Sequence, residues 1–164
     1  MLKYFLERGV IVKKSLIVLS AVLFLMAGCD SKKESLKTCK LTSTDTTSGY
    51  KMDSEYKIYS NGDVVSKVVT VETVETDNEK TLNYFKDYLE KAYSSMDEKY
   101  HGYTNNVEID DNKLTSTTTI DYSKMDMKTY VKDNSAMKSY VNSKNQLTTS
   151  GIIKVYEALG AICE

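Results

Sequence analysis

The segment after residue 37 opens with alternating polar and apolar side chains, which is the period of a half-buried β-strand. Tyr50–Ser60 alternates most clearly, with apolar residues on one face and charged residues on the other. Val64–Glu75 is dense in valine and threonine, both of which favour strands. Thr38–Thr44 is shorter, threonine-rich and partly alternating. These three stretches predict the first three strands.

Two short polar segments predict tight turns. Asn61–Gly62 follows the second strand, and Asn-Gly favours a hairpin because both central positions of a type I′ turn need a positive φ. Asp110–Lys113 precedes a later strand. Asp110 and Asp111 raise the alternative of a calcium site, but an EF-hand loop needs acidic residues at alternate positions and a glutamate at the twelfth. A solvated turn is the better interpretation here, as it is for Asn61–Gly62, where the alternative is a binding loop.

One long helix is predicted over residues 77–98. Thr76 and Glu79 have the spacing of a capping box, in which a glutamate follows the capping threonine by three residues. Apolar residues then recur at helical spacing: Leu82, Phe85, Leu89, Ala92 and Met96. This stripe is expected to pack on the sheet, and the alternative is a groove for an apolar ligand.

The later elements are shorter. Val107 and Ile109 indicate a fourth strand, Leu114–Tyr122 a fifth, and Met125–Val141 one or two helical pieces before a loop at Asn142–Gln146. A last helix, capped at Thr149–Ser150 and stopped by Gly160, is predicted to turn four apolar side chains inward: Ile152, Ile153, Tyr156 and Leu159. The order βββ-α-ββ-α-α predicts an α+β fold: an antiparallel sheet of about five strands in two hairpins, with one long and one or two short helices packed on one face.

The N-terminal residues have the parts of a secretory signal: Lys13 and Lys14, an apolar core over Ser15–Leu25, and the small residues Ala27 and Gly28. The apolar core is shorter than the roughly 20 residues of a membrane span. Leu25–Cys29 resembles the lipobox of bacterial lipoproteins, with Met26 where leucine is commoner. The resemblance implies that a diacylglyceryl group and acyl chains such as palmitate modify Cys29, just after the cleavage site. The alternatives are a plain secretory signal or a buried apolar helix.

These features divide the chain into three predicted regions: a lipoprotein signal peptide at 1–28, the lipidated cysteine with a polar tether at 29–36, and a single α+β lipoprotein domain at 37–164. Two or more acyl chains anchor a protein stably, so we expect it on the extracytoplasmic face of the cell membrane. A further hypothesis starts translation at Val12, because codons for Glu7–Gly9 can form a purine-rich ribosome-binding site.

The predicted mature chain is mildly acidic. Without residues 1–28, 18 of the 22 basic and 22 of the 23 acidic residues remain. Nucleic-acid-binding proteins present a clustered basic face, so no nucleic-acid partner is expected. Tryptophan and proline are absent, and lysine greatly outnumbers arginine. Such usage is typical of AT-rich genomes and favours a Gram-positive source.

Two cysteines remain once Cys29 carries lipid. Cys39 and Cys163 form an even pair in an oxidising compartment, so we predict a disulfide between them; the alternative is two free buried thiols. A metal site is less favoured, because Cys39 has no C-x-x-C partner and His101 is the sole histidine. No cofactor is expected, and His101 is interpreted as a surface residue, not a general base, because no serine or cysteine motif surrounds it.

The mature chain resembles the YehR-like family of small bacterial lipoproteins, whose domain has no established activity. The resemblance lies in the lipobox at Cys29, in C-K-L-T at Cys39–Thr42, in Y-K-I-Y-S-N-G-D at Tyr56–Asp63 and in L-G-A-I-C at Leu159–Cys163. It implies an exported lipoprotein with a two-cysteine α+β domain. It implies no catalytic residues.

The sequence therefore predicts a membrane-anchored extracytoplasmic lipoprotein that is not an enzyme, and that binds a ligand or belongs structurally to the cell envelope. The expected partners are membrane lipid through Cys29 and an unidentified protein, peptide or small molecule; the protein is expected to be a monomer. Thirteen tyrosines can furnish a contact surface. The alternative is an envelope hydrolase that uses a carboxylate pair, although no pair stands out in the sequence.

Overall fold

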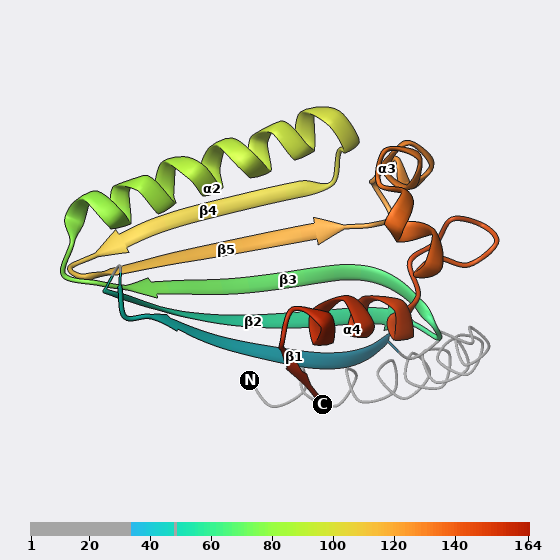
Figure 1. Cartoon of the computed structure of the whole chain (residues 1–164). Coiled ribbons are helices and arrows are strands. Elements are labelled where there is room, and N and C mark those ends of the chain that lie inside the picture. The colour runs from blue at the N-terminus through green and yellow to red at the C-terminus, as the bar shows by residue number, and fades with distance from the viewer. Residues whose placement is uncertain (1–33, 48) are drawn as a thin grey trace, which may run out of the picture. The chain divides into compact units, whose positions relative to one another are not determined.

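Antiparallel strands dominate the described part of the chain, which comprises residues 34–47 and 49–164 of a computed structural model (Figure 1). The strands form a sheet of order β4-β5-β3-β2-β1-β6. Their bounds are β1 Glu34–Asp45, β2 Tyr50–Asn61, β3 Val64–Glu75, β4 Tyr103–Asp110, β5 Lys113–Asp121 and β6 Ile162–Cys163. The predicted α+β class and antiparallel sheet are confirmed. The number of strands is six instead of about five, because the two-residue β6 is too short to show a pattern.

The β2–β3 hairpin turns one residue later than predicted. Asn61 is still paired with Val64, which leaves Gly62 and Asp63 as the loop. Gly62 has a φ of 64° and Asp63 does not have a positive φ. A positive φ at only the first loop residue fits a type II′ turn, so the predicted type I′ turn is wrong. The β4–β5 turn lies in Asp110–Lys113 as predicted.

Helix α2, Glu79–Tyr100, confirms the long predicted helix but begins differently. Its N-cap is Asn78, whose side chain accepts hydrogen bonds from the backbone N–H groups of Lys80 and Thr81. The predicted capping box is wrong, because the helix starts at Glu79, two residues too late for Thr76 to be its N-cap. The Thr76 hydroxyl instead donates to the carbonyl of Gly49 on the β1–β2 connection and accepts from the N–H of Asn78. Asn78 satisfies the free N–H groups at the start of the helix.

Three shorter helical segments follow β5: α3 Met127–Asp133, the 3₁₀ helix η2 Ser135–Ser139, and α4 Thr149–Ala158. The predicted helical pieces in Met125–Val141 correspond to α3 and η2. Helix α4 is capped by the Thr148 side chain, which accepts from the N–H of Gly151, so the predicted cap at Thr149–Ser150 is wrong. Gly160, at φ 94°, ends this region as predicted. Among the described helices, none is long and apolar enough to cross a bilayer.

The helices pack on one face of the sheet, as predicted, and form two main hydrophobic clusters. In the first, α4 places Ile152 and Tyr156 against Tyr56 and Ile58 of β2. In the second, α2 runs along β4 (Figure 1) and places Leu82 against the apolar side chains of three strands: Val74, Val107 and Leu114. Helices α4 and α2 thus pack on different parts of the same sheet face, and strand β3 contributes side chains to both clusters.

Two side chains that were predicted to face inward do not. Leu159 is 61% exposed because α4 ends at Ala158 and the chain reverses at Gly160. Met96 is 43% exposed, although Leu82 of the same stripe is buried. The predicted stripe on α2 is therefore correct from Leu82 to Ala92 and wrong at Met96.

Strand β1 reaches Glu34, four residues before the predicted start at Thr38. Glu34–Leu36 were predicted to be tether, but Glu34 pairs with Asn61 at the end of the long β2 strand. The polar composition of this stretch hides it from sequence patterns. The signal peptide, the Val12 start and Cys29 lie outside the described residues.

Candidate functional site

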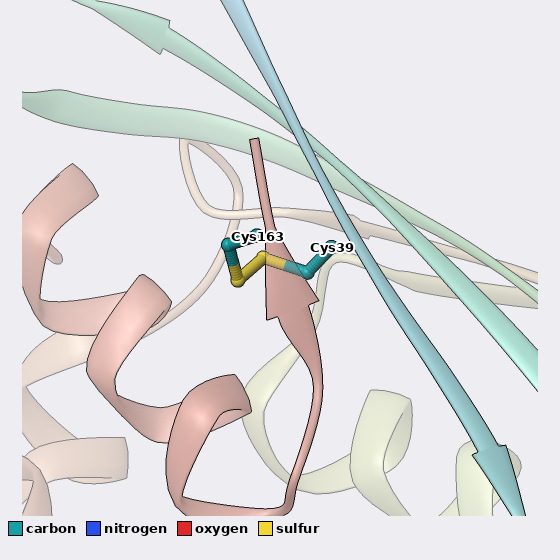
Figure 2. The surroundings of a disulfide bond; sticks show 2 residues. All are labelled: Cys39 and Cys163. Carbon is teal, nitrogen blue, oxygen red and sulfur yellow. A yellow bond between two sulfur atoms is a disulfide. The ribbon is translucent and has the colours of Figure 1, made fainter.

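The predicted disulfide is present between Cys39 and Cys163 (Figure 2), with a Cα–Cα distance of 3.9 Å. The two residues are directly opposite each other on β1 and β6. Thr38 and Glu164 exchange both backbone hydrogen bonds beside them, so the cysteines occupy a non-hydrogen-bonded pair, where side chains are closest. Cys39 is fully buried. Its role is structural, since the bond ties the C-terminus to the sheet.

A band of polar side chains crosses the helix-bearing face between the two hydrophobic clusters. Because directly paired residues of neighbouring strands share a face, the register defines the members of this band in two rows. One row contains Asn105, Thr118, Thr70 and Tyr56, and the other contains Ser116, Glu72 and Ser54. We call these seven residues the polar band. It crosses β4, β5, β3 and β2.

Glu72 of β3 is the charged member of the polar band. It lies between Ser116 of β5 and Ser54 of β2. Its Oε2 atom is buried and has no hydrogen-bond partner among the described residues, and none of the ion pairs found there includes it. Burial raises the pKa of this carboxyl group. A carboxylate in this position is under-solvated, which is unfavourable unless a donor or cation reaches it.

Three tyrosines are close enough to Glu72 for its charge to affect their pKa values. They are Tyr56 of β2, Tyr93 of α2 and Tyr156 of α4. Tyr156 of α4 stacks on Tyr56, with ring centroids 4.1 Å apart. Burial raises the pKa of Tyr93 on α2 to about 12, and the charge of Glu72 adds to this rise. Burial and the same carboxylate also raise the pKa of Tyr156. All three hydroxyls therefore stay protonated at neutral pH and add no charge near the carboxylate.

The β4 end of the polar band opens to solvent. Asn105 donates from Nδ2 to the hydroxyls of Ser116, at 2.9 Å, and Thr118, at 2.7 Å. Its Oδ1 atom is buried and has no partner among the described residues. Asn105 lines a pocket of about 260 Å³ together with Tyr93, Tyr103, Ser94 and three carboxylic residues of α2, namely Glu90, Asp97 and Glu98. The pocket and the band thus offer unpaired acceptors, and the rim is acidic.

The structure places the sequence-predicted residues away from this site. His101 is the exposed C-cap of α2, and Asp110 and Asp111 lie in an exposed turn. In residues 34–47 and 49–164, no group of three or more metal-binding side chains comes together. Sequence reasoning missed Glu72, although a signal existed: at every second position of β3, Val68, Thr70 and Val74 face inward, and Glu72 interrupts that series.

Comparison with solved structures places the fold. The NMR structure of Escherichia coli YehR is 18% identical over 81% of this chain and 92% of that chain, with a TM-score of 0.51. The chain shares its fold with YehR. The fold implied by the sequence resemblance is thereby confirmed. The NMR structure of a protein from Streptococcus pneumoniae TIGR4 is also similar, at 16% identity over 82% of this chain and 87% of that chain, with a TM-score of 0.48. No protein-family model matches the chain, and no curated protein does.

Proposed function

We propose that the protein is a lipid-anchored extracytoplasmic binding protein whose ligand enters the pocket beside α2 and reaches the polar band. The observation that carries this proposal is the buried, unpartnered carboxylate oxygen of Glu72. An unsatisfied buried polar group costs about 1–3 kcal/mol. A binding site explains why such a group occupies the centre of a sheet, since the ligand supplies the missing partner.

The chemistry of the unpaired groups defines the class of ligand. Glu72 Oε2 and Asn105 Oδ1 are both acceptors, so the ligand must donate hydrogen bonds. The carboxylates that line the pocket, such as Glu90 and Asp97, favour positive charge near the entrance. Tyr93 and Tyr103 provide aromatic walls, and aromatic faces attract organic cations. An amine or guanidinium compound fits these features best.

Binding without catalysis is part of the same proposal. Hydrolysis by a carboxylate pair needs a second carboxyl group about 5–10 Å from the first. The negative charge of that second group would help to raise the pKa of the first. Glu72 is not a member of such a pair, because burial is the cause of its raised pKa, and the proposal gives Glu90, Asp97 and Glu98 at the pocket the role of attracting the cation. Ser54 and Ser116, the strand neighbours that flank Glu72, are hydroxyl residues. The anchor of the proposed binding protein is the acylated Cys29, which holds the site at the membrane surface.

A thermal-shift panel tests the ligand class. The probes are spermidine, arginine amide and tri-lysine as cations, N-acetylglucosamine as a neutral compound and citrate as an anion, each at millimolar concentration. A cation that binds well below that concentration stabilises the native state by about 2.7 kcal/mol when present at 100 times its Kd. We expect stabilisation of the wild type by a cationic probe.

Two variants make this test specific. Glu72→Gln should lose the cation-dependent shift. Glu55→Gln should keep it, because Glu55 lies on the opposite face of the sheet, at the register position next to Ser54. Stabilisation by citrate alone, an equal response of Glu72→Gln and the wild type, or no response to any cation would contradict the proposed function.

A further inference from the structure

Positive charge is concentrated in the segment that connects β5 to α4. Residues 123–146, which we call the basic lobe, comprise α3, η2 and the loops around them. The lobe contains five lysines and two aspartates, with no arginine or glutamate. The lysines are Lys124, Lys128, Lys132, Lys138 and Lys144, and all are exposed. Lys124 is paired with Asp121, at 3.1 Å, which leaves four lysines of the lobe outside the ion pairs found in the described residues.

The basic lobe lies at the end of the sheet where β1 begins. Backbone hydrogen bonds join its two flanks to the start of β3: Tyr122 donates to Ser66, and Val65 donates to Leu147. The Ser66 hydroxyl in turn donates to Glu34, the first described residue of β1, at 3.3 Å. Figure 1 shows α3 beyond the end of β5, near the C-terminal end of α2.

The chain between the proposed lipid anchor and this end of the domain is short. Five residue steps separate Cys29 from Glu34, and they span at most about 18 Å when fully extended. Strand β1 has 12 residues, so its far end lies about 40 Å from its start. The tether therefore keeps the β1 start, and with it the basic lobe, near the bilayer.

The opposite end of the sheet carries the opposite charge. Residues 75–80 and 108–113 contain six carboxylic residues and two lysines. These two segments meet there, because Thr76 donates its backbone N–H to the carbonyl of Asn112, and the Asn112 side chain donates to Asp77. An anionic surface attracts the exposed lysines of the basic lobe and repels the acidic end, over the Debye length of about 10 Å. Glu34, Asp63 and Asp121 also lie at the lobe end of the sheet, so the attraction acts through the lobe and not through that end as a whole.

We propose that the basic lobe lies against the anionic headgroups of the bilayer that holds Cys29, so that the sheet stands upright with its acidic end outward. This inference rests on the lipid anchor of the proposed function. Lysines close to an anionic membrane are each attracted to it appreciably. The lobe is the part of the domain where both the short tether and the charge favour this contact.

Lysine footprinting on the lipidated full-length protein tests the orientation. The protein is reconstituted in vesicles of phosphatidylcholine alone or with about one-third phosphatidylglycerol, and acetylation of each lysine is followed by mass spectrometry. We expect Lys128, Lys132, Lys138 and Lys144 to react about three-fold or more slowly on the anionic vesicles. Lys51, Lys80 and Lys113, at the acidic end, should react equally on both. About 1 M salt should remove the difference.

Charge-reversal variants provide the matched comparison. The triple variant Lys132→Glu, Lys138→Glu and Lys144→Glu should lose the protection of Lys128, whereas Lys51→Glu, Lys80→Glu and Lys113→Glu should retain it. Circular dichroism confirms that both fold. Flotation and intact mass report the anchor separately. A protein without the lipid mass that fails to float overturns the anchor and this orientation together. A floating, lipidated protein with unprotected lobe lysines, or with equal protection on neutral vesicles, overturns the orientation alone.

Discussion

At the scale of single residues, Glu72 combines an inward position on β3 with a side chain that is most stable in water. Its neighbours across the sheet, Ser54 and Ser116, are both buried hydroxyl residues, and within residues 34–47 and 49–164 neither donates a hydrogen bond to Glu72 Oε2. A residue of this kind lowers stability and is therefore expected where function requires it. Substitution of Glu72 should therefore change the stability of the protein even when no ligand is present.

We expect Glu72→Gln to raise the free energy of unfolding near pH 8 by about 1 kcal/mol, because a buried neutral amide is less costly than a buried carboxylate. Burial raises the native pKa of Glu72 above its ordinary value of 4.5, so the native state holds this proton more tightly than the unfolded chain. Wild-type stability therefore falls as the pH rises from about 4.5 through the native pKa.

Thermal unfolding between about pH 4 and pH 8 measures this effect. The melting temperature of Glu72→Gln should exceed that of the wild type at the upper end by about 3–5 °C, and the gap should close toward the lower end. Glu55→Gln, on the other face of β2, serves as the control and should follow the wild type. A Glu72→Gln variant that is less stable at every pH would show that the carboxylate has a partner.

At the scale of elements, the start of α2 depends on a contact with another part of the chain. The Thr76 hydroxyl donates to the carbonyl of Gly49, at 2.9 Å, and its oxygen accepts from the N–H of Asn78, at 3.2 Å, so Thr76 belongs to the turn before the helix. Asn78 then caps α2. Asn78→Ala should lower the free energy of unfolding by about 1 kcal/mol, since two backbone donors lose their side-chain acceptor.

Urea denaturation of Asn78→Ala provides the measurement, with Asn83→Ala as its matched control. Asn83 is an exposed residue inside α2, where alanine has the better helix propensity, so this control should be neutral or slightly stabilising. Equal destabilisation by both substitutions would contradict the assignment of Asn78 as the cap.

At the scale of the whole molecule, the disulfide closes nearly the entire domain, because Cys39 and Cys163 are 124 residues apart. Loop-closure entropy for a loop of this length corresponds to about 5 kcal/mol. Cys163→Ser should therefore lower the melting temperature by well over 5 °C. The double variant Cys39→Ala and Cys163→Ala should cost about as much as either single one, since one bond is lost in each case. Additive losses, measured by calorimetry, would contradict this account.

The proposed lipid anchor also concerns the whole molecule, because an acylated Cys29 would decide where the domain is held. Cys29→Ala should remove the acyl chains and leave the protein either unprocessed or released from membrane fractions. Fractionation followed by intact mass distinguishes these two outcomes. A variant that remains in the membrane and is still cleaved before residue 29 would contradict the lipobox interpretation.

The sequence by itself determined the elements whose stability is local or whose pattern is regular. Alternation in Tyr50–Ser60 and Val64–Glu75 predicted two central strands, because side chains of a half-buried strand face solvent and core in turn. The stripe from Leu82 to Leu89 predicted α2 for the corresponding reason. The cysteine count predicted the disulfide, since the expected lipidation of Cys29 leaves two thiols for pairing.

Only the tertiary structure decided features that depend on residues distant in sequence. Strand β6 is too short to have a pattern and exists because the disulfide places it beside β1. The cap of α2 is Asn78 instead of Thr76, because the helix starts only at Glu79, after a turn in which the Thr76 side chain contacts Gly49 and Asn78. Glu72 alternates correctly for an inward position, but its isolation follows from the register of β3 with β2 and β5, which puts hydroxyl residues beside it. Register is set by long-range pairing, and one sequence does not contain it.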